Sequence, residues 1–382
     1  MGYPRARRAP VMGADAHADL EADMSTSYSP DTLIIDAADP AEIDLLNADL
    51  QAHGHDRPLG KPTPIGDGRM VVPVTGGTAA AALRTLDAVR PGHSGRGDAE
   101  LSNDTVKLDL GIASKNIGHG SSFALIDKTG EKPTEWRAVP AGMRRPVVAV
   151  LDTGVQRHDW LPTGTEDDPF RIDATAVTGF PAWDPDLMLG DVVVHPDDQG
   201  LREEGHGTFV AGLILAASPT TRILDVRVMT PQGKTRESVV NAALAWLIRY
   251  RRAGNPVDVV CMAFGRKPGD TTDPADLTHM GDLLRRLSDD GVQLVASAGN
   301  DHRSGEIYPA AFSCVTAVGA GFGGYHATFS NYGTWVDRYR DGVSVFGIFP
   351  DGSPAGVWAR WSGTSFAAAN FAGDLARPHV IG

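Results

Sequence analysis

The sequence predicts an α/β protein, a doubly wound and mostly parallel sheet with helices on both faces, preceded by a small α+β N-terminal unit. From residue 146 onward, short apolar strands alternate with helices, which is typical of repeated β-α-β units. The first of these strands, "PVVAVLDTGV" (146–155), is apolar almost throughout, as a parallel strand covered on both faces requires. We expect the functional side chains at the carboxyl ends of such strands.

Hydrophobic periodicity and glycine boundaries place the individual elements of this C-terminal domain, for which we expect residues 146–382. No internal repeat is visible in it. The expected strands cover 146–155, 222–229, 257–265, 292–299 and 314–320, and the expected helices cover 206–217, 236–254, 274–291 and 364–376.

A smaller unit precedes this domain. Residues 1–30 mix charge, Ala, Ser and Pro without periodicity and are expected to be disordered. Residues 31–110 predict the α+β unit, and residues 111–145 predict a linker and lead-in to the larger domain. Within the unit we expect strands at 32–36 and 69–76 and helices at 40–54 and 77–90, while a strand at 105–113 could close either part.

Composition narrows the range of partners and compartments. A formal net charge of −13 over 382 residues argues against nucleic-acid binding, which needs a basic face. The chain has no apolar run of about 18 residues, so we expect no membrane span. The N-terminus has no apolar stretch of signal-peptide type, which predicts a cytoplasmic protein, or a secreted one if a segment is missing upstream. Cys261 and Cys314 lie in apolar runs and are expected to be buried free thiols rather than a disulfide.

Three side chains with complementary chemistry lie at junctions of the predicted elements. Asp152 ends the first apolar strand, His206 opens a helix between two glycines, and Ser365 opens a helix after Gly363-Thr364. In nucleophilic acyl transfer an imidazole takes the proton of a hydroxyl, and a carboxylate fixes the imidazole tautomer. Each residue alone is more often a cap or a turn residue, so it is the combination that favours a hydrolase.

The contexts of these residues, "VLDTGV", "GHGTFVAG" and "GTSFAAANFAG", resemble in this order the three hallmark segments of the subtilisin-like serine protease family, the subtilases. The resemblance covers roughly residues 140–376. It implies a serine-type endopeptidase in which Asp152, His206 and Ser365 form the catalytic triad and an acyl-enzyme is the intermediate. Its partner would be a peptide or protein substrate.

The same resemblance implies further site residues. Asn300 in "VASAGN" would supply an oxyanion donor beside the backbone N–H of Ser365. The stretch 308–310 ("YPA") would lie near the substrate pocket. The N-terminal unit has the size and mix of elements of the family's prodomain, which implies an intramolecular inhibitor; the alternative is an unrelated targeting or partner-binding domain, because the unit has no diagnostic motif. A substrate would pair with or contact Ala263, Phe264, Gly265, Ala296, Ser297, Ala298 and Gly299.

The chain departs from the family pattern beside the triad. Phe209 replaces a second histidine, Phe366 replaces a methionine, and Ala369 replaces a proline, while Asn370 and Phe371 stand where His and Val are common. None of these changes removes a catalytic group. Phe366 adjoins the nucleophile, so we expect it to narrow access to the site.

Other readings of the motifs are weaker. A protease-like module used only for binding is the main alternative. An aspartic protease needs two carboxylates that share a proton, whereas "DTG" occurs once here, and H-E-x-x-H is missing. Catalysis is expected to need no cofactor. A structural calcium ion is left open but assigned to no residue, because the acidic stretches 166–170 and 195–200 lack an EF-hand pattern and are typical of solvated loops.

Overall fold

The C-terminal domain is organised around an eight-stranded, mostly parallel sheet with the strand order β14-β13-β12-β11-β7-β9-β8, in which β15 also pairs with β13. All pairings along it are parallel except that of β13 with β14. The doubly wound sheet predicted from the sequence is thereby confirmed. Its strands are β7 (Val147–Asp152), β8 (Arg171–Asp173), β9 (Arg222–Arg227), β11 (Val259–Met262), β12 (Gln293–Ser297), β13 (Thr316–Phe322), β14 (Tyr325–His326) and β15 (Arg338–Arg340).

The structure is a computed structural model, and it describes most of this domain and parts of the region before it. The described residues are 28–36, 40–52, 54, 59–66, 69–75, 82, 106–113, 123–126, 137–162, 164–166, 169–181, 202–231, 233–266, 278–322, 325–350 and 356–380.

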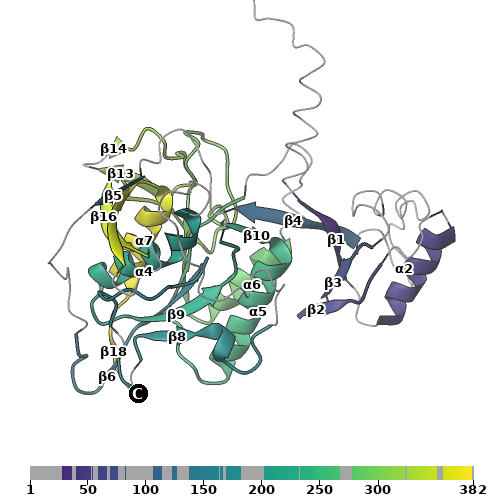
Figure 1. Cartoon of the computed structure of the whole chain (residues 1–382), viewed down its shortest axis with the longest axis horizontal. Coiled ribbons are helices and arrows are strands. Elements are labelled where there is room, and N and C mark those ends of the chain that lie inside the picture. Colours follow the sequence, from purple (N-terminus) through teal and green to yellow (C-terminus); the bar gives the residue numbers. More distant parts are fainter. Residues whose placement is uncertain are drawn as a thin grey trace, which may run out of the picture.

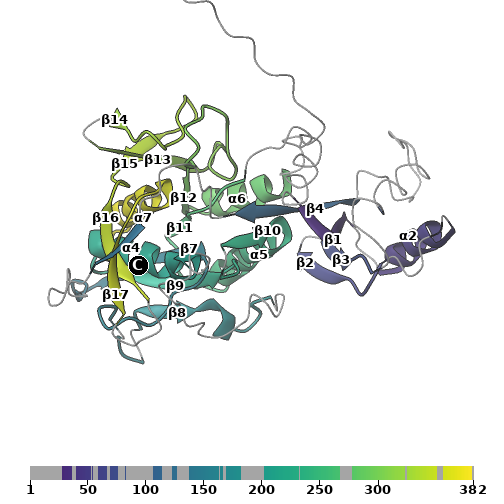
Figure 2. The same ribbon diagram turned by 45° about the horizontal axis from the view of Figure 1, so that its top comes forward.

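Helices cover both faces of the sheet (Figure 2). Val148 and Val150 of β7 point into one apolar core with α4 and α7, while Val147, Ala149 and Leu151 point into another with α5 and α6. This alternation explains why the β7 sequence is apolar on every residue, since a strand between two layers buries both of its faces. The helices are α4 (His206–Ala217), α5 (Glu237–Arg252), α6 (Thr278–Asp289) and α7 (Thr364–Leu375).

The strand order reverses at β7. From β7 the chain passes to β9 on one side and then to β11 on the other side, so β7 and β11 flank a topological switch point. Ligand sites of open α/β sheets lie at such a point, beyond the carboxyl ends of the strands. Asp152 ends β7, and Ala263 follows β11 directly at this same edge.

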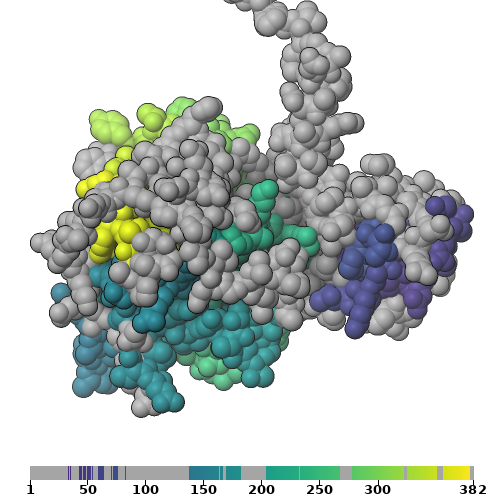
Figure 3. All heavy atoms as spheres, in the orientation of Figure 1, coloured from purple at the N-terminus to yellow at the C-terminus, as the bar shows by residue number. Residues whose placement is uncertain are grey.

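The N-terminal unit lies beside the C-terminal domain (Figures 1 and 3) and has antiparallel strands and a small core of its own. Helix α2 (Pro40–Ala52) contributes Ile43, Leu46 and Leu50 to that core. Leu33 and Ile35 of the sheet face them. The strands are β1 (Tyr28–Asp36), β2 (Thr63–Gly66), β3 (Arg69–Pro73) and β4 (Val106–Ala113).

Strand β4 joins the two parts of the molecule. It pairs with β1 on one side and with β10 (Lys234–Arg236) of the C-terminal domain on the other, giving a continuous sheet β10-β4-β1-β3-β2. Helix α5 lies against β2 and β4. The strand expected at 105–113 therefore closes both parts rather than either one.

The stretch 111–145, expected as a linker, also holds strands. Strand β5 (Phe123–Ile126) adds to a hairpin of β16 (Val345–Phe349) and β17 (Val357–Trp361). Strand β6 (Met143–Arg144) pairs with β18 (His379–Val380). Short segments such as these become strands because a partner distant in the sequence supplies the hydrogen bonds, a signal that local periodicity does not carry.

The longer elements agree with their predicted positions. Helix α4 begins and ends at the expected residues, 206 and 217, and α5 and α6 end before the glycines expected to stop them. Residues 1–27 and nearly all of the helix expected at 77–90 lie outside the described residues. None of the described helices is long and apolar enough to cross a membrane.

Candidate active site

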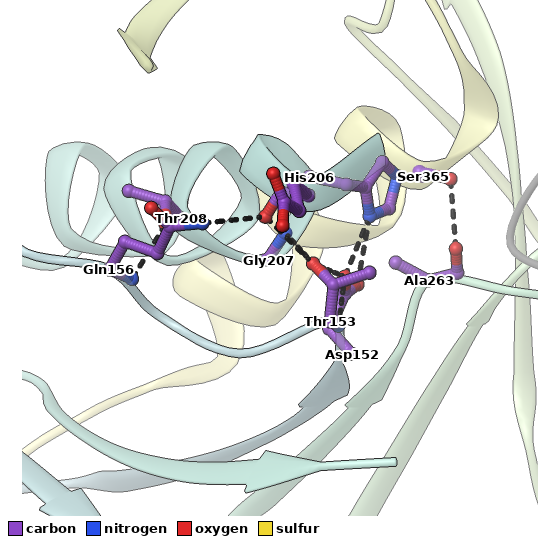
Figure 4. A network of polar contacts seen from close by, with 9 residues as sticks. Asp152, Thr153, Gln156, His206, Gly207, Thr208, Ala263 and Ser365 are labelled. Atoms are coloured by element: carbon purple, nitrogen blue, oxygen red, sulfur yellow. Dashed lines mark hydrogen bonds and ion pairs between the residues drawn. The ribbon is translucent and has the colours of Figure 1, made fainter. Parts of the chain in front are cut away.

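Asp152 and His206 form a buried pair where β7 ends and α4 begins (Figure 4). Their side chains are almost fully enclosed, with exposed fractions of 0% for Asp152 and 3% for His206. His206 Nδ1 lies 2.9 Å from both carboxylate oxygens. Because a carboxylate only accepts hydrogen bonds, Nδ1 carries the hydrogen and Nε2 is the basic nitrogen of the ring.

The hydroxyl of Thr153 ties together the elements that carry this pair. Its Oγ1 can donate its one hydrogen to either of two acceptors, Asp152 Oδ1 at 3.2 Å or the carbonyl oxygen of Glu204, in the turn before α4, at 3.2 Å. The same oxygen accepts the N–H of Gly207 at 3.1 Å. At Gly207 a Cβ would stand 2.4 Å from the Gly154 carbonyl oxygen, so only glycine allows the helix to approach β7 this closely.

Aromatic side chains enclose the His206 ring. The Trp361 ring meets the imidazole edge-on, with ring centroids 5.6 Å apart. The Phe366 ring lies at the same centroid distance and is tilted relative to the imidazole. Phe366 also packs on Phe209 at 4.7 Å and is only 1% exposed. Phe366 therefore supports the imidazole from the core and does not narrow access to the site, contrary to the expectation from its position in the sequence.

Ser365 is the second residue of α7, and its hydroxyl points toward Ala263 rather than toward His206 (Figure 4). Oγ donates to the Ala263 carbonyl oxygen at 2.9 Å. Since a hydroxyl has one hydrogen, it does not donate to His206 in this conformation. The backbone N–H of Ser365 belongs to the first turn of a helix, where N–H groups have no intrahelical acceptor.

Asn300 follows Gly299 just beyond β12, and Thr364 holds its side chain. Asn300 Oδ1 accepts the Thr364 N–H at 2.8 Å and the Thr364 hydroxyl at 2.9 Å. The Thr364 hydroxyl oxygen in turn accepts the N–H of Gly299 at 3.0 Å. With Oδ1 directed to Thr364, the two Nδ2 hydrogens face the other way, and no described residue accepts them.

The residues expected to contact substrate lie along two neighbouring strand ends. Ala263, Phe264 and Gly265 follow β11, and the backbone of the next residue, Arg266, exchanges hydrogen bonds of 2.7 and 3.1 Å with Tyr308. Ala296 and Ser297 end β12, and Ala298 and Gly299 lead to Asn300. The structure thus brings the first stretch against Ser365 and the second against Thr364.

Neither cysteine has the surroundings of a nucleophile. Both are free, and burial raises the pKa of each thiol. The charge of Asp152 raises the pKa of Cys261 further. A reactive cysteine needs the opposite shift, because the thiolate is the nucleophile.

No metal site emerges from the part of the chain that the structure describes. There, no three His, Cys, Asp or Glu side chains form a group that could hold a metal ion. Of the two acidic stretches, 195–200 lies outside the described residues and 166–170 is described only in part.

Three residues around the site were not predicted from the sequence. Thr153 and Thr364 each stand next to a predicted catalytic residue, so their adjacency was an available signal. Asn331, which bonds to the loop around Asn300, lies 31 residues after it in a loop of its own. Nothing in the local sequence pattern connects it with the site.

The family model described as the Subtilase family matches residues 144–378. Among curated proteins, the chain is 30% identical over 187 residues to a subtilisin-like protease of Coccidioides posadasii, covering 47% of this chain and 44% of that protein. It is 29% identical over 215 residues to subtilisin DY of Bacillus licheniformis, covering 52% of this chain and 73% of that protein. The chain thus spans less than half of the fungal relative's length. A solved structure of a cold adapted subtilisin-like serine proteinase matches 60% of the chain at 21% identity with a TM-score of 0.42.

Proposed function

Because the chain belongs to the subtilase family, we propose that it is a serine endopeptidase that hydrolyses peptide bonds through Asp152, His206 and Ser365. The observation that carries the proposal is the buried Asp152–His206 pair, whose Nδ1 contacts of 2.9 Å leave Nε2 as a base beside the Ser365 helix. A hydroxyl nucleophile needs an imidazole as its base and a carboxylate that orients and stabilises this imidazole, and the site contains all three groups.

The reaction begins with a rotation of Ser365. Its Oγ leaves the Ala263 carbonyl and turns to His206 Nε2, which takes the proton as Oγ attacks the carbonyl carbon of the scissile peptide. Asp152 stabilises the imidazolium that forms. His206 then gives the proton to the leaving amine nitrogen, the C–N bond breaks, and an acyl-enzyme remains on Ser365. Water, deprotonated by His206, releases the acid in the second half of the cycle.

The developing oxyanion would be bound by two donors. These are the backbone N–H of Ser365 and Nδ2 of Asn300. In support, Thr364 holds Oδ1 of Asn300 and so orients its amide before substrate arrives. A donor that is already oriented needs no reorganisation when charge develops, which is why such donors contribute strongly to catalysis.

Substrate would lie along Ala263, Phe264 and Gly265 as an extended strand. The Ala263 carbonyl becomes free to accept a substrate N–H when Ser365 turns to His206. The small residues 296–299 would form the wall of a neighbouring pocket that would take a large apolar side chain. Main-chain pairing supplies affinity in this mode of recognition, and the pocket supplies selectivity.

Labelling with a fluorophosphonate probe tests the catalytic proposal. We expect the full-length wild-type chain to form an adduct on the peptide that contains Ser365, detected by mass spectrometry. Ser365→Ala removes the adduct, whereas Ser304→Ala, which changes an exposed serine, keeps it. A folded wild-type chain that forms no adduct at Ser365 contradicts the proposal.

The N-terminal unit would act as an intramolecular inhibitor. Strand β4 ends on β10, which lies just after β9 at the carboxyl edge of the sheet. The next described strand, β5, pairs with β17, which leads directly into the turn before Ser365. The region before the catalytic domain thus attaches to it both at β10 and at β17, and this arrangement would restrict the entry of other peptides.

Removing the β4–β10 hydrogen bonds tests this inhibition. A triple variant, Gly111→Pro, Ile112→Pro and Ala113→Pro, removes every N–H that this part of β4 could donate to β10. We expect it to label faster with the probe than wild type. Gly111→Ala with Ile112→Ala keeps those N–H groups and serves as the matched control. Equal labelling rates in the proline variant and its control contradict the inhibitory role.

A further inference from the structure

Asn331 binds the loop that carries Asn300 on both sides of that residue. Its Nδ2 donates to the Ala298 carbonyl oxygen at 2.8 Å, and its backbone N–H donates to the Gly299 carbonyl oxygen at 2.9 Å. Beyond Asn300, Asn331 Oδ1 accepts the N–H groups of Asp301 at 3.0 Å and Arg303 at 3.1 Å. The four bonds bracket Asn300 without touching its side chain.

An asparagine suits this position for a chemical reason. The loop presents a carbonyl oxygen on one side and two N–H groups on the other, so a side chain that binds both must donate and accept at once. A short amide does both, whereas a carboxylate only accepts. Asn331 is 0% exposed, so water does not replace a bond that is lost there.

Asn331 is itself anchored to the central sheet. The preceding residue, Ser330, accepts the N–H of Ala320 in β13 at 3.0 Å through Oγ, and the same hydroxyl donates to the Asn331 carbonyl oxygen at 2.9 Å. The loop around Asn300 is therefore connected through Asn331 to a buried strand. Its position is set by the body of the domain and not by the loop alone.

Asn300 thus has two separate supports. Thr364 fixes the orientation of its side-chain amide, and Asn331 fixes the backbone that carries it. We propose that Asn331 is a positioning residue for the oxyanion donor, acting through Asn300 in the reaction proposed above. The inference rests on that proposed function, because it assigns Nδ2 of Asn300 to the oxyanion.

A double-mutant cycle with Asn300 tests the inference. Asn331→Asp keeps the two contacts to Asp301 and Arg303 but replaces the donor that faces the Ala298 carbonyl. We expect kcat for a peptide anilide to fall roughly 10- to 100-fold with KM within about twofold, less than the roughly 10²- to 10³-fold loss for removing the donor itself. In an Asn300→Ala background, the same substitution changes kcat by less than about threefold, because it acts through a group already absent.

Two further measurements separate positioning from a general loss of stability. Asn255→Asp removes one amide-to-carbonyl bond of a partly buried asparagine, to Tyr250, and is expected to leave kcat unchanged. Hydrogen exchange at the amides of Asp301 and Arg303 is expected to rise in Asn331→Ala, which removes the oxygen that accepts them, and this readout needs no catalysis. Failure of the protease proposal itself appears separately, as missing probe labelling at Ser365. Equal losses of kcat in both backgrounds, or unchanged exchange at these amides, overturn the role of Asn331.

Discussion

The acid–base half and the nucleophile half of the candidate site differ in how far their interactions are already formed. Asp152 and His206 are in contact at 2.9 Å inside a closed network that includes Thr153. Ser365, by contrast, donates its hydroxyl hydrogen to the Ala263 carbonyl. The contacts of one half are formed in the structure, whereas the proposed contact of the other half requires a change of side-chain rotamer.

The difference follows from where each half is anchored. Asp152 and His206 sit on a strand end and a helix start that are packed directly against each other, so their geometry follows from the fold. In the proposed reaction, Ser365 would turn from the Ala263 carbonyl to His206 by side-chain rotation, a motion that proteins make rapidly compared with typical turnover. The proposed base is therefore preorganised, and the proposed nucleophile would be engaged only when it turns.

The largest effect is expected from breaking the preorganised half. Asp152→Asn replaces the carboxylate that accepts from His206 Nδ1 with an amide that can donate to Nδ1. The ring is then held in the tautomer with its hydrogen on Nε2, which cannot accept a proton. We expect kcat to fall about 10⁴-fold. Asp173→Asn, an exposed helix-cap change, should leave kcat unaltered. Steady-state kinetics with a peptide anilide measures both, and a loss of less than tenfold for Asp152→Asn argues against the assigned roles.

An intermediate effect is expected from the nucleophile half. Asn300→Ala removes one oxyanion donor while the Asp152–His206 contact stays intact, so kcat should fall by about 10²- to 10³-fold with little change in KM. Asn255→Ala is the matched substitution away from the site. A rise in KM at constant kcat would show that Asn300 binds the ground state and transition state equally.

The smallest effect is expected from loosening the network around the base. Thr153→Val removes the hydroxyl that contacts Asp152, Glu204 and Gly207, and losing hydrogen bonds of this kind should lower kcat about tenfold. Thr153→Ser keeps the hydroxyl and should retain wild-type kcat. If the valine and serine variants have the same kcat, the hydroxyl does not support the base.

Much of the fold could be predicted from periodicity. Helix α4 agrees with its predicted bounds because a buried helix framed by Gly205 and Ser218 has clear local signals. The hairpin of β16 and β17 and the three-residue strand β10 were not predicted. Their strand character depends on pairing with distant segments, and β10 pairs with a strand from the N-terminal unit.

Within the site, the sequence by itself determined which groups are present. An acid at a strand end, an imidazole and a hydroxyl at helix starts, and an amide after a small-residue strand are local features with recognisable contexts. Only the tertiary structure decided how they are held. The Ser365 hydroxyl bonds to the Ala263 carbonyl, the Asn300 side chain bonds to Thr364, and the loop around Asn300 bonds to Asn331. Those contacts join residues 28 to 102 positions apart, and only the packing of the whole domain brings such partners within hydrogen-bond distance.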